Sequence, residues 1–297
     1  EALDRDDLGR RSGDATCVAI VASYRPLMQT KLARRLAPRS YPELSDLLRE
    51  QLEEPSHEAE IRASLPLLKP TLDPTSLAVQ QQYEDSPYPR WTRCSVAEPL
   101  PFQAAVNRAL PHLPSKETPD LAKPRILIAG CGTGLETMRV VNSYQSASIL
   151  AIDLSVASLA YGVRKAREYG VSNVEHLQAD ILDLPVLTER FDLIESFGVL
   201  HHMADPRAGL AVLAGLLKPK GLLSIGLYSE IGRQAVVEAR RLIAREGYEA
   251  DLGGIRQLRR ELMTHKRPEL NAVISPASDF WTTSDCRDLL FHVNEHR

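Results

Sequence analysis

Short apolar runs alternate with longer amphipathic stretches between residues 124 and 229 of this 297-residue chain. The apolar runs predict buried strands over residues 125–129, 148–152, 174–178, 191–196 and 222–227. Between them, apolar residues recur at helical spacing over residues 135–144, 155–169 and 206–217. Strands that alternate with helices of this length are typical of a parallel sheet with crossover helices on both faces. We therefore predict an α/β fold with a doubly wound, mostly parallel sheet.

Helical patterns flank this predicted core on both sides. Residues 14–36 predict a helix that Pro26 breaks or kinks, and residues 41–65 predict two helices separated at Pro55. Residues 66–74 contain three prolines and are predicted to be a linker. After residue 229, helices are predicted over residues 230–245, 255–266 and 284–293, and residues 271–275 (NAVIS) form a further strand-like run.

These patterns divide the chain into four parts. We expect a helical N-terminal region (1–75), a connector or lid (76–123), the α/β core (124–229), and a helical substrate or lid region (230–297). The first residue is Glu, and no strand pair follows the last predicted helix. The chain is therefore expected to be a fragment of a longer protein, and we leave open whether that protein contains helical repeats.

Composition and charge disfavour several classes of protein. The formal net charge is −3, whereas a dedicated nucleic-acid binder is usually basic. No apolar run approaches the roughly 20 residues that span a bilayer. The four cysteines (Cys17, Cys94, Cys131 and Cys286) form no CxxC pair, which argues against a zinc site or a disulfide framework. We expect a cytoplasmic protein without a metal site, and we leave its oligomeric state open.

A glycine-rich turn follows the first predicted strand. The segment ILIAGCGTG (126–134) places Gly130, Gly132 and Gly134 at alternating positions, directly before a predicted helix. Glycine lets the backbone turn sharply and lets a ligand approach without meeting a Cβ atom. The helix N-terminus adds N–H groups and a partial positive charge. Together they predict a cradle for a ligand.

Three further strand ends are expected to meet this cradle. Ligands of open parallel sheets bind beyond the carboxyl ends of the strands, where the strand order reverses. Asp153 ends the second predicted strand and is suited to accept hydrogen bonds from a ribose diol. Asp180 and Ile181 follow the third, where they suit a base edge and a base face, and residues 198–202 follow the fourth. The ligand is therefore expected to be a nucleoside.

A dinucleotide-binding domain is the competing nucleotide interpretation. Its fingerprint is GxGxxG, with a pyrophosphate at the helix N-terminus. Here the third glycine comes one residue early, and Leu135 occupies the later position. The loop alone is a weak signal, but the combination with Asp153, Asp180 and the segment after the fourth strand is stronger.

At this point the chain resembles the class I S-adenosylmethionine-dependent methyltransferases, which have a Rossmann-like fold. The segments that carry the resemblance lie between about residues 124 and 229 and are ILIAGCGTG (126–134), AIDLS (151–155), QADILDL (178–184), FDLIESFGVLHHMADP (191–206) and LLKPKGLLSIGLYS (216–229). More loosely, YEDSPYPRW (83–91) and the C-terminal segment resemble bacterial members with helical repeats before the methyltransferase domain.

The resemblance implies S-adenosylmethionine as the cofactor and assigns residues to its parts. Asp153 is expected to hold the ribose hydroxyls while Leu154 packs on the adenine, and Asp180 is expected to accept from the adenine amino group beside Ile181. Residues from the glycine turn and the end of the fourth strand are expected to line the ribose and methionine parts: Gly130, Cys131, Gly132, Gly134, Phe197 and Gly198.

One position departs from the family pattern. The family usually has an acidic residue two positions before the first glycine, and Ile128 stands there in this chain. The usual contact to the cofactor's amino group is therefore expected from elsewhere, with Tyr83, Arg90 and Trp91 as candidates. The alternative for the segment that holds these three residues is a connector whose aromatic side chains fill a hydrophobic gap.

Two histidines are the candidates for acid–base chemistry. His201 and His202 follow the fourth predicted strand, where a general base would help a hydroxyl or phenol acceptor. The alternative is that both are structural. We predict a methyltransferase that acts on a protein side chain or a small metabolite, with nucleic acid and membranes disfavoured as partners. The competing hypothesis is a non-catalytic helical scaffold with a degenerate methyltransferase-like domain. The missing acidic residue at Ile128 is the observation that supports it.

Overall fold

The structure is a computed structural model that describes residues 15–31, 33, 36, 41–264, 267–275 and 279–292. The chain forms two compact units, residues 1–64 and residues 65–297. The predicted linker over residues 66–74 therefore belongs to the second unit. Among the described residues, none of the helices has the length and apolar character that a bilayer crossing requires.

The first unit is helical, as predicted. Helix α2 (Ala15–Tyr24) ends before Pro26, and a 3₁₀ turn, η2 (Leu27–Gln29), follows it. Of the rest of the predicted helix over residues 14–36, several residues, Asp14 among them, lie outside the described part. Val18, Leu27, Leu48 and Leu52 contribute to the buried core of this unit.

The predicted break at Pro55 is replaced by a change of helix type. A 3₁₀ turn, η5 (Pro42–Leu44), leads into α3 (Ser45–Leu48), a π-helical stretch η6 (Arg49–Glu53) and α4 (Glu54–Arg62). Pro55 stands in the first turn of α4, where its missing N–H is least costly. The π-helical stretch joins α3 directly to α4, so the chain is helical without a break from residue 45 to residue 62.

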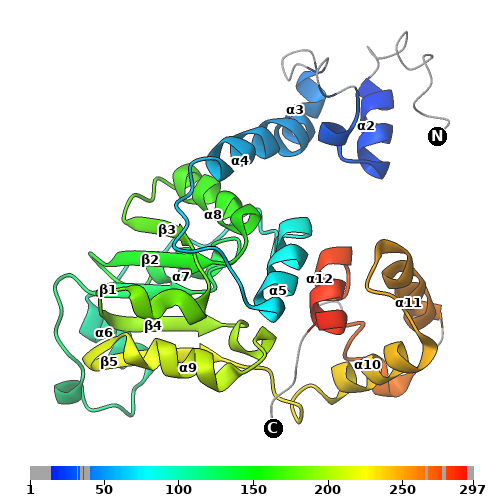
Figure 1. Cartoon of the computed structure of the whole chain (residues 1–297). Coiled ribbons are helices and arrows are strands. Elements are labelled where there is room, and N and C mark those ends of the chain that lie inside the picture. The colour runs from blue at the N-terminus through cyan, green and yellow to red at the C-terminus, as the bar shows by residue number, and fades with distance from the viewer. Residues whose placement is uncertain are drawn as a thin grey trace. The chain divides into compact units, whose positions relative to one another are not determined.

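The second unit is built on a five-stranded parallel sheet within the described residues (Figure 1). The strand order is β3-β2-β1-β4-β5. The bounds are β1 Arg125–Ala129, β2 Ser148–Asp153, β3 Val174–Gln178, β4 Phe191–Phe197 and β5 Leu217–Gly226. The chain moves outward from β1 in one direction through β2 and β3, and in the other through β4 and β5. The order thus reverses between β1 and β4, and the predicted doubly wound fold is confirmed.

Both faces of the sheet are buried. Alternate strand residues point to opposite faces, and each face packs against helices. Ile126 and Ile128 of β1 pack on one face, in a core shared with α6 (Phe102–Ala109), α7 (Leu135–Val141) and α8 (Val156–Glu168). Leu127 and Ala129 pack on the other face, in a core shared with the 3₁₀ segment η8 (Ile181–Val186) and α9 (Pro206–Gly215). This two-sided burial explains why the strands read as continuous apolar runs.

Two segments before β1 differ from the sequence prediction. Residues 66–68 pair with the edge of β3, since Leu68 N donates to Gln178 O at 2.9 Å and Gln178 N donates to Pro66 O at 2.9 Å. Helix α5 (Pro74–Asp85) follows, with Asp73 as its N-cap. The sequence analysis missed this helix, because only its central residues show an apolar pattern.

Two segments at the end of the chain also differ. β5 begins five residues earlier than predicted, because the expected turn over residues 218–221 is an irregular part of the strand in which Lys220 has φ 66°. The strand-like run over residues 271–275 forms turns, after the 3₁₀ turn η10 (Pro268–Leu270). Val273 of this run buries its side chain in a core built by helices.

The helices after β5 form a third core. They are α10 (Gln234–Glu246), α11 (Leu252–Thr264), α12 (Thr283–Arg287) and the π-helical segment η11 (Asp288–His292). The ends of two helices predicted there, over residues 255–266 and 284–293, extend beyond the described residues. Phe280, Cys286 and Leu290 are fully buried in this core together with apolar residues of α10 and α11. The group lies beside α5 in Figure 1.

Candidate functional site

A cavity of about 470 Å³ opens at the carboxyl ends of the strands, where the strand order reverses. This volume lies in the range of small-molecule sites, roughly 300–1,000 Å³. Its wall combines the ends of β1, β2, β3, β4 and β5 with α5 and with Asp288 from η11. Most of the predicted site residues line it: Tyr83, Gly130, Cys131, Gly132, Asp153, Leu154, Asp180, Ile181, Phe197, Gly198 and His202.

Four predicted site residues lie outside this cavity wall. Gly134 packs against α8, because a Cβ on this glycine would stand 3.0 Å from the Cα of Gly162. His201 is fully buried between the rings of His202 and Tyr228, with centroids 4.3 and 4.4 Å away. Arg90 and Trp91 pack against Tyr161 of α8. Their proposed contacts with a ligand are therefore not made through this cavity.

The glycine turn needs glycine for two separate reasons. Gly130, Gly132 and Gly134 have φ values of 79°, 51° and 85°, a region that other residues rarely adopt. In addition, a Cβ on Gly130 would stand 2.3 Å from Cγ2 of Val199. The turn is thus pressed against the segment after β4, and the two together form the floor of the cavity.

Asp153 connects the end of β2 to the glycine turn and to α8. Its Oδ2 accepts the N–H of Gly132 at 2.8 Å, and its Oδ1 accepts the N–H of Ser155 at 2.9 Å. Burial raises the pKa of Asp153 to about 6, although the backbone N–H groups of Ser155 and Gly132 oppose the rise. Each carboxylate oxygen keeps a second lone pair for a ligand on the cavity side.

Asp180 and Leu154 are also fixed by the chain around them. Oδ1 of Asp180 accepts the N–H of Leu182 at 2.9 Å, as the N-cap of η8, and the residue is buried. The carbonyl of Leu154 accepts from the side-chain amides of Gln80 at 2.9 Å and Gln178 at 3.0 Å. Helix α5 is thereby tied to the loop after β2.

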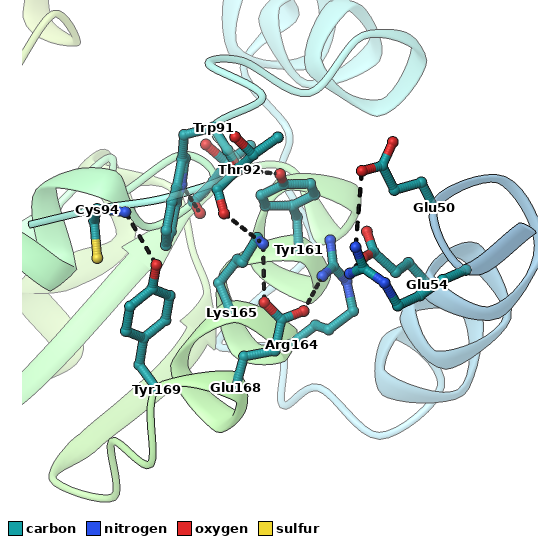
Figure 2. A network of polar contacts seen from close by, with 12 residues as sticks. Glu50, Glu54, Trp91, Thr92, Cys94, Tyr161, Arg164, Lys165, Glu168 and Tyr169 are labelled. Carbon is teal, nitrogen blue, oxygen red and sulfur yellow. Dashed lines mark hydrogen bonds and ion pairs between the residues drawn. The ribbon is translucent and has the colours of Figure 1, made fainter. Parts of the chain in front are cut away.

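The segment from Tyr88 to Thr92 fastens the glycine turn to α8. Trp91 Nε1 donates to Thr133 O at 3.0 Å, and the hydroxyl of Thr133 donates to Pro89 O. Figure 2 shows the other side of Trp91, where Lys165 Nζ donates to Thr92 O at 3.1 Å and pairs with Glu168. The indole of Trp91 thus fills a gap between α7 and α8, whereas Tyr83 and Tyr88 of the same connector line the cavity.

Polar groups gather at the end of the cavity nearest α5 and η11. The hydroxyl of Tyr83 donates to Oδ1 of Asp288 at 2.5 Å and lies 3.1 Å from Nε2 of His202. Burial raises the pKa of Asp288 to about 6 and keeps the pKa of Tyr83 well above its usual range. Tyr88 and Tyr228 complete this end, and burial raises the pKa of each phenol.

The comparisons with known proteins agree with this geometry. A family model described as a methyltransferase domain matches residues 126–221. An uncharacterized protein of Synechococcus sp. is 43% identical over 127 residues, which are 42% of this chain and 30% of that protein. The tRNA U34 carboxymethyltransferase of Methylococcus capsulatus is 33% identical over 123 residues, 40% of this chain and 38% of that enzyme. The structure of PKMT2 from Rickettsia typhi in complex with AdoHcy covers 70% of this chain and 42% of its own, at 22% identity and a TM-score of 0.48.

The residues matched by the family model hold the glycine turn, Asp153 and Asp180. Residues 126–221 therefore form a methyltransferase domain of the class I S-adenosylmethionine-dependent type. The family and the cofactor predicted from the motifs are thereby confirmed. The chain spans only 30% and 38% of the length of the two curated relatives named above.

The cavity of this methyltransferase suits its cofactor in shape and in polarity. Gly198 has φ 71°, and a Cβ there would find no atom closer than 4.0 Å, so this glycine leaves the cavity open. The hydroxyl of Ser158 is buried at the cavity wall and has no hydrogen-bond partner among the described residues. Asp153 and Asp180 each present a carboxylate to the same space. These groups match a ligand with several hydroxyl and amino donors.

The sequence analysis of this methyltransferase missed several residues of the wall. Tyr228 follows β5, and Asp288 comes from the C-terminal helices, so no strand-end pattern marks either of them. Glu136 also lines the cavity, from the first turn of α7. Its place two residues after the last glycine of the turn is a signal that was available in the sequence.

Proposed function

We propose that this protein transfers the methyl group of S-adenosylmethionine to a nitrogen or oxygen atom of an acceptor. The observation that supports this most is the position of Asp153 in the cavity, where it holds the glycine turn and faces the ligand space. In this proposal Asp153 accepts the ribose hydroxyls, and Asp180 accepts the adenine amino group beside Ile181 and Leu154. When bound, the cofactor supplies a methyl group on a positively charged sulfur.

The protein contributes mainly position and a dry environment to such a displacement. An acceptor atom must lie in line with the methyl group and must lose its hydration. In the proposal, Phe197 and Gly198 flank the methionine part, and α5 and η11 exclude water from the reacting atoms. The half-buried phenols of Tyr83 and Tyr228, whose pKa values are raised, offer polar groups to orient the acceptor without adding charge.

His202 is our candidate for the general base. Tyr83 has one hydroxyl proton and gives it to Asp288, so Nε2 of His202 is the donor in the 3.1 Å contact. Asp288 and Tyr83 thus orient the His202 ring and stabilise its cationic form when it takes the acceptor's proton. His201 packs behind His202, and we assign it a supporting role.

For the acceptor we favour a protein side chain, followed by a small metabolite. The helical first unit is a common device for docking a partner protein, and it supports this order. The net charge of −3 disfavours a nucleic acid. The relative that acts on tRNA matches 40% of this chain, so its substrate is a weak guide. The four cysteines are free, which fits the cytoplasmic location that we propose.

Isothermal titration calorimetry with S-adenosylmethionine, S-adenosylhomocysteine and NAD tests the cofactor assignment. We expect the first two to bind with micromolar affinity and NAD to fail to compete. Release of S-adenosylhomocysteine in the presence of amine, hydroxyl and peptide acceptors then tests transfer. The absence of any binding by folded protein would favour the non-catalytic scaffold, for which the buried Ile128 is the supporting observation.

A further inference from the structure

Ile128 stands at the position where the family pattern has an acidic residue that contacts the cofactor's amino group. The side chain of Ile128 is 1% exposed and belongs to the hydrophobic core, so it makes no polar contact. A class I methyltransferase still has to compensate the α-ammonium group of its cofactor, because an isolated charge in a cavity is costly. Another acid must therefore face the methionine end of the cavity.

Two acids, Glu195 and Glu136, are candidates for this contact. Glu195 of β4 is the register partner of Ile128 on β1, so both side chains point to the same face of the sheet. Glu136, on the first turn of α7, lines the cavity directly. Phe197, which we assign to the methionine part, is the third residue of this end.

Arg139 joins these two acids into one unit. Its Nε donates to both carboxylate oxygens of Glu136, at 2.9 and 3.0 Å, and its Nη2 donates to Oε2 of Glu195 at 2.5 Å. Its guanidinium carbon lies 5.7 Å from the ring centroid of Phe197, which places it at the same end of the cavity. Arg139 therefore fixes the carboxylate of Glu136 in one position.

The charge of this unit favours a cation. One guanidinium offsets one carboxylate, so the unit carries a net charge of −1 when both acids are ionised. Glu195 is 3% exposed, and burial raises its pKa above the usual range of a glutamate. Glu136 is the acid of this unit that reaches the cavity wall. A cation bound there is attracted to the unit and keeps Glu195 ionised.

On the basis of the proposed function, we propose that Glu136, fixed by Arg139, takes over the role of the acid missing at Ile128 and binds the α-ammonium group of the cofactor. Glu195 is a positioning residue in this arrangement, because it holds Arg139 from the neighbouring strand. Tyr83, Arg90 and Trp91 are then not needed for this contact. Asp288 stays at the acceptor end, where Tyr83 and His202 engage it.

Calorimetry with three ligands tests the proposal: S-adenosylhomocysteine, its analogue without the α-amino group, and 5′-methylthioadenosine, which lacks the amino-acid end. In Glu136→Gln we expect the affinity for S-adenosylhomocysteine to fall about tenfold. The affinities for the other two ligands should stay within about twofold of the wild type. The matched control is Glu238→Gln, which breaks an equivalent pair with Arg241 on α10, outside the cavity wall.

Four outcomes would overturn the inference. Equal losses for all three ligands in Glu136→Gln would show a structural role, and unchanged affinities would show no role at all. If Asp288→Asn, rather than Glu136→Gln, selectively lowers the affinity for S-adenosylhomocysteine and leaves the other two ligands unchanged, the ammonium group binds at the other end of the cavity. Failure of the wild-type protein to bind S-adenosylhomocysteine would overturn the proposed function first, and this inference with it.

Discussion

The N–H of Gly132 donates to Oδ2 of Asp153 at 2.8 Å, so the carboxylate that ends β2 fixes the turn that ends β1. Asp153→Ala should weaken S-adenosylhomocysteine binding by more than tenfold, about 1.4 kcal/mol or more, because both the ribose acceptor and the fixed turn are lost. Calorimetry measures this change. The control is Asp205→Ala, which removes the N-cap of α9 away from the cavity wall. Unchanged affinity in a folded Asp153→Ala variant would refute the ribose assignment.

Cofactor affinity should depend on pH through the same residue. The pKa of Asp153 is about 6, so the carboxylate gains a proton as the pH falls below that value and then loses acceptor capacity. We expect the affinity for S-adenosylhomocysteine to fall by up to about tenfold per pH unit below pH 6. Titrations between pH 5 and pH 8 measure it. Asp153→Ala should flatten this profile, and a profile that stays the same in that variant would contradict the assignment.

Gly130→Ala should destabilise the protein more than Gly170→Ala does. Both glycines have positive φ values, 79° and 68°, so both substitutions strain the backbone. Only the new Cβ at position 130 meets a neighbour, 2.3 Å from Val199 Cγ2, whereas none lies within 4 Å at position 170. We expect an additional loss of about 1–3 kcal/mol for Gly130→Ala in urea unfolding. Equal losses would mean that the contact with Val199 relaxes freely.

Trp91 should contribute to stability through its packing and through one hydrogen bond. Trp91→Phe keeps a ring in the gap but loses the bond to Thr133, which should cost about 1 kcal/mol of unfolding free energy. Trp91→Ala should cost about 3–5 kcal/mol. Trp281→Phe is the matched control, because that indole also donates to a carbonyl but is 44% exposed. A control loss as large as that of Trp91→Phe would show that burial is not the cause.

Asp288→Asn should change how stability depends on pH. Burial raises the pKa of Asp288 from 3.8 to about 6, so this carboxyl favours the folded state most below pH 4. That contribution is lost as the pH rises through 6, by up to about 3 kcal/mol. The wild type should therefore lose stability relative to Asp288→Asn between pH 4 and pH 7 in urea unfolding without ligand. A difference that does not vary with pH would contradict the buried, strained carboxylate.

The sequence predicted those parts of the molecule whose structure is decided locally. The helix predicted over residues 155–169 is α8, which Ser155 caps through the bond from Ser158 N and which ends before Gly170, with φ 68°. Asp153 and Asp180 reached the cavity because parallel strands bring their carboxyl ends to one edge. These residues needed no knowledge of distant contacts.

The residues that the sequence did not indicate depend on distant packing. Asp288 enters the cavity only because α10, α11 and α12 form a separate core that carries it back to Tyr83, which lies 205 positions earlier. The sequence alone did not decide whether the indole of Trp91 contacts a ligand or fills a hydrophobic gap, because the positions of α7 and α8 determine this. Helix α5 depends on its cap, Asp73, and on Gln80 binding the carbonyl of Leu154, rather than on a regular apolar pattern.

The wall of the cavity takes residues from Ser76 to Asp288, which has a consequence for synthesis of the protein. The β-sheet and its glycine turn can form once residue 226 has left the ribosome, but the acceptor end stays open until Asp288 follows. A growing chain therefore carries a place for the cofactor before it has a closed place for the acceptor.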